Sequence, residues 1–347
     1  MTSTDSTAWG VVGHDAAVEL MRRQIAAGHV RHSTLVTGAA GIGKRTLVNA
    51  FLKALNCDNP PAAGLFCGAC RSCQKIERGV HPDIQRFDLA SQAAASARKG
   101  GLNRQITIDT ARDVRASAAM RPIEARWRIV VIDDAETLAE PAQEALLKTL
   151  EEPPPSMLLF LLSDDPEALL PTIRSRCQIV DLRPVPVAEI EPLLLQRGAA
   201  PDKAEELARM AQGRPGWALN ALTKPAIATQ HLTDVEEAVA WLGSDPYHQL
   251  VTAFRLADRF GNGRSETFDR LTTLQTVWRD LLLIGSGVPD RVTYTAARDR
   301  LVGLASNWTL SDLKRGILAV QTCISDLEAN VRPRLAMETM VLQWPNR

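Results

Sequence analysis

Residues 34–44 read TLVTGAAGIGK, and this stretch decides the fold of the chain. The apolar run Thr34–Thr37 predicts a buried β-strand, and the glycine-rich loop after it leads into a helical pattern. Glycines let backbone N–H groups approach phosphate oxygens, while the N-terminus of the helix and a lysine add positive charge. The sequence therefore predicts a phosphate-binding loop. Its expected contact residues are Gly38, Gly41, Gly43 and Lys44.

A second apolar run, Arg128–Ile132, is followed directly by two carboxylates, Asp133 and Asp134. Its β-branched residues predict a buried parallel strand with acids at its carboxyl end. Ligands of open α/β sheets bind at that edge. The pattern predicts an α/β fold in which Asp133 helps to hold magnesium through water.

The predicted nucleotide site departs from the pattern of a hydrolytic enzyme at two places, one beside the loop and one after the second strand. The residue after the lysine should be Ser or Thr to hold magnesium, but it is Arg45, and Thr46 comes one place too late. At the position after Asp133, a hydrolytic enzyme of this type needs a glutamate that polarises water. The chain has Asp134 there, and the missing methylene group moves the carboxylate by roughly 1.5 Å. We therefore predict a degraded pocket that can bind ATP or ADP, with slow hydrolysis or none.

Residues 146–177 contain the segments LLKTLEEPPPS and LLPTIRSRC. They place a Ser-Arg-Cys tripeptide after an apolar strand, on a segment suited to reaching a neighbouring subunit. A planar, permanently charged guanidinium can donate two parallel hydrogen bonds to phosphate oxygens during phosphoryl transfer. Arg176 is the candidate for such a finger, and Arg174 could serve the same end if the segment turns. Ordinary surface salt bridges are the alternative for both arginines. Glu151 and Glu152 are either solvated or help to position this segment.

Four cysteines have the spacing C-x9-C-x2-C-x2-C. Closely spaced thiolates favour tetrahedral zinc, and four ligands leave no open position, so the site should be structural. The predicted ligands are Cys57, Cys67, Cys70 and Cys73. Free thiols or two disulfides are the alternatives. Cys177 and Cys323 have no partners in sequence, and we expect them to be buried as apolar residues.

The composition suits a globular chain of two or three domains, since 45% of the 347 residues are hydrophobic. The 40 basic and 40 acidic residues balance, so any contact with DNA should be local. Residues 1–8 lack the basic start and apolar run of a signal peptide, and no stretch approaches the length of a membrane span. We expect a cytoplasmic protein without membrane partners, which fits reduced cysteines and zinc.

Three other segments carry expectations that a structure can test. Residues 91–104, rich in Ala, Ser and Gly, predict a mobile loop rather than a dedicated DNA hook. Residues 106–108 predict an edge strand that leads into a helix capped by Asp109 or Thr110. An apolar stripe at helical spacing predicts core more than partner surface. Its residues are Leu271, Leu274, Trp278, Leu281 and Leu282.

These motifs are similar to those of bacterial sliding-clamp loader subunits of the AAA+ class, and most to the delta-prime subunits of DNA polymerase III. The resemblance runs from Val12-Gly13-His14 through the motifs above to residues 330–338, which read NVRPRLAME, so it covers almost the entire chain. The gamma/tau motor subunits share this architecture, but their helical lid carries an arginine that touches the γ-phosphate. Gly216 stands at that position here, and Arg214 lies two residues early.

The resemblance implies a RecA-like parallel-sheet core over residues 1–183 with a zinc module at 57–73. It also implies a helical lid over residues 184–232 and an all-α collar for oligomerisation over residues 233–347.

The implied function is that of a largely non-hydrolysing subunit that offers Arg176 to the ATP of a motor subunit. The implied partners are gamma/tau and delta subunits in a hetero-pentamer, with the sliding clamp and primed DNA reached through the complex. The complex belongs to the DNA-directed DNA polymerase holoenzyme, and we expect no strong intrinsic ATPase or polymerase activity from this chain.

Two other functions remain open at the level of sequence. One is an active ATP-hydrolysing motor subunit of gamma/tau type, which would bind magnesium-ATP through Gly43, Lys44, Thr46 and Asp133. The other is a zinc-dependent adaptor for nucleic acid, for which the basic residues near the cysteines are few. They are Arg71, Lys75 and Arg78.

Overall fold

The computed structural model describes residues 9–89, 92, 105–118, 120–261 and 263–345. The chain divides into two compact units. The first comprises Met1–Gly198 and Gly213–Ala218, and the second comprises Ala199–Gln212 and Leu219–Arg347. All of the loop predicted at 91–104, except Gln92, lies outside the described residues.

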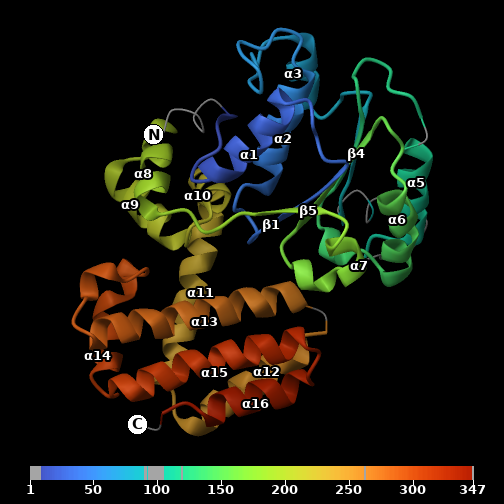
Figure 1. The fold of residues 1–347 in the computed structure, drawn as a ribbon. Helices are drawn as coiled ribbons and strands as arrows, with labels where there is room; N and C mark the ends of the chain where they lie inside the picture. The colour runs from blue at the N-terminus through green and yellow to red at the C-terminus, as the bar shows by residue number, and fades with distance from the viewer. Residues whose placement is uncertain (1–8, 90–91, 93–104, 119, 262, 346–347) are drawn as a thin grey trace. The chain divides into compact units, whose positions relative to one another are not determined.

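A five-stranded sheet forms the centre of the first unit (Figure 1). The strands are β1 (Ser33–Thr37), β2 (Ile84–Phe87), β3 (Arg128–Ile132), β4 (Met157–Ser163) and β5 (Gln178–Asp181). They lie in the order β2-β3-β4-β1-β5, and each neighbouring pair is parallel. The predicted α/β fold with a parallel sheet is therefore confirmed.

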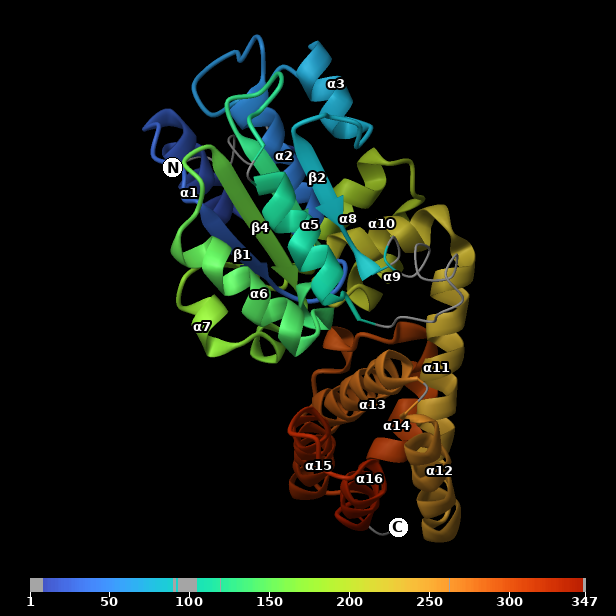
Figure 2. The same ribbon diagram turned by 90° about the vertical axis from the view of Figure 1, so that its right-hand side faces the viewer.

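Helices cover both faces of this sheet, as Figures 1 and 2 show. The helices on one face are α1 (Asp15–Ala26) and α2 (Lys44–Asn56), with α3 (Arg71–Glu77) packed on α2. Those on the other face are α5 (Ile108–Ala118), α6 (Glu140–Glu151) and the short α7 (Pro171–Arg174). All seven residues of β4 are buried because both of its faces are covered. Phe160 packs toward α2, and its neighbour Leu161 packs toward α5 and α6, as the two-residue period of a strand requires.

The edge strand predicted at residues 106–108 does not form. Ile106 makes one isolated bridge with Leu138, and α5 already begins at Ile108. The backbone N–H of Ile106 donates to Thr137 and its carbonyl accepts from Ala139, so it pairs with the loop after β3 rather than with the sheet. The side chain of Ile106 is fully buried against that loop and α6, and this packing explains the apolar pattern.

The remaining elements of the first unit include α8 (Val187–Gln196) and the start of α10 (Pro215–Thr223). Short 3-10 helices follow β3 and β4. They are η2 (Ala135–Thr137) and η3 (Pro166–Ala168).

The second unit is helical over its described residues. Its helices are α9 (Pro201–Met210), α11 (Pro225–Gly243), α12 (Pro246–Arg259), α13 (Arg264–Gly285), α14 (Arg298–Ala305), α15 (Leu310–Glu328) and α16 (Pro333–Leu342), with 3-10 helices η4 (Pro289–Arg291) and η5 (Thr295–Ala297). One helix, α11, runs through the domain boundary predicted at residue 232.

The apolar stripe along α13 lies in the hydrophobic core of the second unit, as predicted. Leu271, Leu274, Trp278 and Leu281 are fully buried, while Leu282 is partly buried at its edge. Trp278 stacks with two other tryptophans at ring distances of 5.2 and 5.9 Å. Among the described residues, no helix has the length and apolar content needed to cross a membrane.

One glycine fixes how closely α15 approaches this core. A Cβ atom added at Gly316 would lie 2.6 Å from ring atoms of Trp278. We expect Gly316→Ala to lower the free energy of unfolding by about 1–3 kcal/mol, because the indole must shift within a filled core. Chemical denaturation of the full chain, followed by circular dichroism, measures this change.

The matched control is Gly303→Ala in α14, where an added Cβ meets no atom within 4 Å. That variant should be as stable as the wild type or more stable by up to about 1 kcal/mol. Equal stability of both variants and the wild type would contradict the close packing of α15 against the indole.

Candidate functional site

The predicted phosphate loop lies between β1 and α2. Gly38, Gly41 and Gly43 have φ angles of 138°, 77° and 120°, in the region where a side chain would be strained. Gly43 directly precedes α2, and no side chain caps the first N–H groups of that helix. These N–H groups lie at the N-terminus of a helix, where they can donate hydrogen bonds to an anion.

The lysine of the loop is held within the protein. Lys44 is buried, and its Nζ atom donates to the carbonyl oxygens of Gly38 at 2.6 Å and Ala39 at 3.2 Å. The same ammonium forms an ion pair with Asp164, which follows the last residue of β4. Its charge is thus already balanced by a carboxylate and by the loop's own carbonyls.

Arg45, the residue after Lys44, occupies the position where a hydrolytic site requires a magnesium ligand. The Nε atom of Arg45 donates to Asp133 Oδ2 at 2.6 Å, and its Nη2 atom lies 3.4 Å from Asp88 Oδ2. Partial burial opposes the charge of Arg45, but the carboxylates of Asp133, Asp88 and Asp134 outweigh it and raise the pKa of the guanidinium. The acid predicted to help hold magnesium is therefore paired with a fixed cation.

The second acid after β3 makes a backbone contact. Asp134 has a left-handed backbone (φ 54°), and its Oδ2 atom accepts a hydrogen bond from the N–H of Leu89 at 3.3 Å. Burial and the neighbouring charge of Asp133 raise the pKa of the Asp134 carboxyl group. Its expected failure to activate water stays a prediction. Thr46 is exposed on α2, one position beyond the residue that ion-pairs with Asp133.

Asp164 is a site residue that sequence reasoning missed. The signal was present, because an acid follows the apolar strand 157–163 in the same way that Asp133 follows β3. The sheet register places the end of β4 beside the end of β1, where the phosphate loop starts. Pairing between Asp164 and Lys44 depends on that register, which a strand pattern alone does not give.

The start of α10 lies against the phosphate loop. The N–H of Gly216 donates to the carbonyl of Gly41 at 2.8 Å, and a Cβ atom at Gly216 would come within 2.7 Å of that oxygen. A Cβ atom added at Gly41 would in turn lie 3.0 Å from the backbone nitrogen of Trp217. Glycine at position 216 therefore allows this close contact, and it provides no side chain that could reach a phosphate.

The candidate finger lies at the end of the short helix α7, before β5. Arg176 is about one-third exposed, and its Nη2 atom lies 2.8 Å from Glu151 Oε1 at the end of α6. Its Nη1 atom also donates to the carbonyl of Thr172 at 3.0 Å. Arg174 pairs instead with Glu167. Glu151 thus contacts and positions the finger candidate, while the action of Arg176 on a neighbouring nucleotide stays a prediction.

The four predicted zinc ligands come together between α2 and α3. The sulfur atoms of Cys57, Cys67, Cys70 and Cys73 all lie within 4.8 Å of one another. Cys57 Sγ lies 3.5 Å from Cys67 Sγ and 4.0 Å from Cys70 Sγ. Sulfurs bound tetrahedrally to zinc at about 2.3 Å would lie about 3.8 Å apart, so the arrangement fits this metal. All six described cysteines are free, so the structure shows no disulfide among them, and free thiols stay the alternative to zinc.

Backbone groups of this cluster favour thiolates. The N–H groups of Cys67, Cys70 and Cys73 donate to the sulfurs of Cys57, Cys67 and Cys70 at 3.2 to 3.4 Å. The backbone N–H groups of Ala69 and Cys70 lower the pKa of the Cys67 thiol to about 7. Hydrogen bonds of this kind to the ligand atoms orient metal ligands in proteins. Burial acts in the opposite direction: it raises the pKa of Cys57 and Cys73 within the cluster, and it raises the pKa of Cys177 and of Cys323 to about 12.

A parallel α/β unit with a glycine loop between β1 and α2, and acids after β3 and β4, has the architecture of the P-loop class. A protein family described as "DNA polymerase III, delta subunit" matches residues 13–186, half of the chain. The chain belongs to this family.

Curated relatives include three kinds of DNA polymerase III subunit. The delta' subunit of Pseudomonas aeruginosa is 37% identical over 188 residues, which are 53% of this chain and 53% of the relative. The tau subunit of Escherichia coli is 32% identical over 225 residues, 63% of this chain and 33% of the relative. The gamma/tau subunit of Mycobacterium bovis is 28% identical over 95% of this chain and 59% of the relative. The chain thus spans from a third to about three fifths of the length of these relatives.

Among solved structures, a gamma-subunit-related protein from Thermotoga maritima aligns with a TM-score of 0.42 and 18% identity, covering 94% of this chain and 97% of that one. The delta protein of the Bacillus subtilis clamp loader aligns with a TM-score of 0.36 and 11% identity, covering 94% and 98%. The assignment to the family rests on the sequence match.

The pairing of Arg45 with Asp133 predicts how magnesium affects nucleotide binding. Affinity of the wild type for a fluorescent ATP analogue should be nearly the same with and without magnesium. Arg45→Ser frees Asp133 and adds a hydroxyl group, so magnesium should tighten binding about tenfold. Fluorescence titration with magnesium or with a chelator measures both affinities.

Arg45→Ala is the matched control, because it frees the carboxylate without adding a hydroxyl ligand. It should gain less from magnesium than Arg45→Ser. A wild type that already needs magnesium for tight binding would show that the guanidinium does not block this position.

Proposed function

We propose that this chain is a delta-prime-type subunit of a bacterial replicative clamp loader. In this role it does little or no hydrolysis itself and offers Arg176 to ATP bound by a neighbouring motor subunit. The observation that carries the proposal is the ion pair of Arg45 with Asp133, which puts a protein cation where a hydrolytic site needs magnesium. Family membership and the delta' relative support the assignment.

Several features of the phosphate loop agree with weak chemistry in this chain's own pocket. Lys44 is engaged by Asp164 and two loop carbonyls, and Gly216 provides no side chain for a γ-phosphate. The loop geometry still fits a phosphate group, because its glycines and the start of α2 are formed. ATP or ADP bound here would meet Lys44 and the N–H groups of α2. It would serve structure rather than turnover.

The finger role rests on the exposure and surroundings of Arg176. A guanidinium that is partly exposed, and held by one exposed carboxylate and one backbone carbonyl, can change partners when a phosphate group approaches. We therefore propose gamma/tau-type motor and delta-type subunits as the neighbours in a hetero-pentamer. The sliding clamp and primed DNA would be engaged by the whole assembly, in the bacterial cytoplasm.

An active motor of gamma/tau type is the second candidate. The match to the gamma/tau relative over 95% of this chain favours it. It requires Lys44 to leave Asp164 and Arg45 to leave Asp133 when magnesium-ATP binds. The two candidates differ in which single substitution stops ATP hydrolysis.

We also propose that the four-cysteine cluster binds one structural zinc ion. Four sulfur ligands complete a tetrahedral shell and leave no position for water, so the ion would stabilise the segment between α2 and α3. A nucleic-acid role for this module has little support. Lys75 already pairs with Glu124, whose carboxylate also lies 4.0 Å from Arg71.

The finger proposal makes a prediction for hydrolysis by the reconstituted clamp loader. Arg176→Ala in this chain should slow ATP turnover at the facing motor site by about a thousandfold or more, because the guanidinium stabilises charge in phosphoryl transfer. Lys44→Ala in this chain should leave turnover unchanged. Clamp- and DNA-stimulated phosphate release measures both variants.

Arg183→Ala is the matched control, since Arg183 is an exposed arginine in the same region with only a 3.7 Å contact to Asp181. It should behave as the wild type. If Lys44→Ala removes a share of hydrolysis while Arg176→Ala has no effect, the chain is a motor and the finger proposal fails.

The metal proposal makes a separate prediction. Elemental analysis of the purified chain should give one zinc ion per chain, and Cys73→Ser should reduce this content strongly and lower the melting temperature. Cys73 is the buried member of the cluster, so no exposed group can replace it readily. Cys177→Ala should retain a full zinc content, and a wild-type content far below one per chain would refute the metal site.

A further inference from the structure

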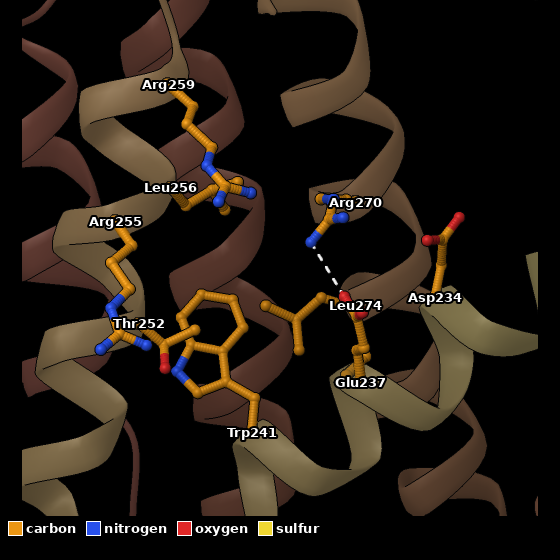
Figure 3. A pocket seen from close by; sticks show the side chains of 10 residues that line it. Asp234, Glu237, Trp241, Thr252, Arg255, Leu256, Arg259, Arg270 and Leu274 are labelled. Atoms are coloured by element: carbon orange, nitrogen blue, oxygen red, sulfur yellow. Dashed lines mark hydrogen bonds and ion pairs between the residues drawn. The ribbon is translucent and has the colours of Figure 1, made fainter.

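A separate cavity lies in the second unit, among α11, α12 and α13 (Figure 3). It has a volume of about 220 Å³ and belongs entirely to this unit. The residues that matter for its chemistry are Trp241, Thr252, Arg255, Leu256, Arg259 and Leu274. None of these residues belongs to the phosphate loop, the finger segment or the cysteine cluster.

Two arginines form the basic side of this cavity. Arg255 and Arg259 lie one helical turn apart on α12, and both side chains extend from that helix toward the cavity (Figure 3). Within the described part of the chain, neither guanidinium makes an ion pair or hydrogen bond. Like charges spaced four residues apart on a helix destabilise it slightly. A bound anion would relieve this repulsion.

The opposite side of the cavity is acidic, because the lining carboxylates Asp234 and Glu237 outnumber the single lining arginine, Arg270. Arg270 on α13 pairs with Glu237 at 2.9 Å, as the dashed line in Figure 3 shows, and with Glu266 at 3.4 Å. Asp234 accepts a hydrogen bond from Gln230 at 3.1 Å. The positive charge still available to a ligand is therefore on α12.

Apolar side chains lie between these two sides. Trp241 is fixed because its Nε1 atom donates to the carbonyl of Gln249 at 2.9 Å, and its ring stacks edge-on with Trp344 at 5.1 Å. Its indole lies beside Thr252 and Arg255 in Figure 3. Leu256 and Leu274 add aliphatic surface. A ligand must therefore combine an apolar group with a nearby negative charge.

The size of the cavity limits the ligand class. Pockets for drug-sized ligands have volumes of about 300–1,000 Å³, so this one is too small for a nucleotide and suits one anchoring side chain. Duplex DNA would present phosphates on a wide surface, and it has no apolar group to fill the space beside Trp241. A peptide with an aromatic or aliphatic side chain beside a carboxylate meets both requirements.

We propose that this cavity is a docking site for an acidic peptide segment of a partner protein. An apolar side chain of the peptide fills the space against Trp241 and Leu256, and an adjacent carboxylate binds Arg255 and Arg259. Charge complementarity identifies the occupant, because two exposed guanidiniums without partners face one small apolar cavity. This proposal is independent of the clamp-loader function.

The test uses a capped dipeptide, N-acetyl-4-fluorophenylalanyl-glutamate amide, whose only charge is the glutamate side chain. Fluorine NMR line broadening is titrated with the full-length chain. The matched glutamine dipeptide should bind about tenfold more weakly, because it lacks the charge-assisted bonds to arginine. The double variant Arg255→Glu, Arg259→Glu should lose the preference for glutamate.

Arg300→Glu is the control, since Arg300 is an exposed arginine on α14 that does not line the cavity. It should bind as the wild type does, and circular dichroism melting checks that all variants are folded. Equal binding of the glutamate and glutamine dipeptides to the wild type would overturn the proposal. So would a short DNA duplex that binds the wild type but not the double variant while neither dipeptide binds, because the arginines would then serve nucleic acid.

Discussion

Two cations at the start of α2 pair with acids that the parallel sheet collects at its carboxyl edge. Lys44 pairs with Asp164 after β4, and Arg45 pairs with Asp133 after β3 and approaches Asp88 after β2. Parallel strands end at one edge, so acids from separate parts of the sequence are forced together there. Without these two cations the carboxylates would repel one another, and the loop could not rest on the sheet as it does.

The same pairing determines what the edge can do chemically. A magnesium ion carries two positive charges and bridges protein oxygens to phosphate oxygens. It can also dissociate and be replaced. The guanidinium of Arg45 carries one charge, has no site for a ligand oxygen beyond its N–H donors, and is covalently fixed. It can satisfy Asp133, but it cannot bind a water molecule and lower its pKa as a metal ion does. Under the proposed function, the fold keeps the geometry of a phosphate loop, and we expect little or no hydrolysis in this chain's own pocket.

Sequence reasoning succeeded where local pattern determines structure. The apolar runs predicted strands, the glycines predicted the loop, and the cysteine spacing predicted a four-sulfur cluster that the structure brings within 4.8 Å. Sequence reasoning failed where contacts between segments that are distant in sequence determine the local structure. Ile106 has a strand-like sequence but packs on the loop after β3, and the contact of Asp164 with Lys44 spans 120 positions of sequence. The cavity beside Trp241 combines residues of three helices, and no local pattern identified it.

The contrast between Lys44 and Arg176 argues for action on a neighbour rather than in this chain's own pocket. Lys44 is buried, and moving it toward a phosphate would break two hydrogen bonds to carbonyls as well as its pair with Asp164. Each such bond contributes about 0.5–1.5 kcal/mol. Arg176 lies at the surface, and an exposed pair such as that with Glu151 contributes about 1 kcal/mol or less. A phosphate charge from outside can therefore displace Glu151 while the hydrogen bond of Arg176 to the Thr172 carbonyl stays in place, whereas a phosphate in the loop must compete with two carbonyls and Asp164 for Lys44.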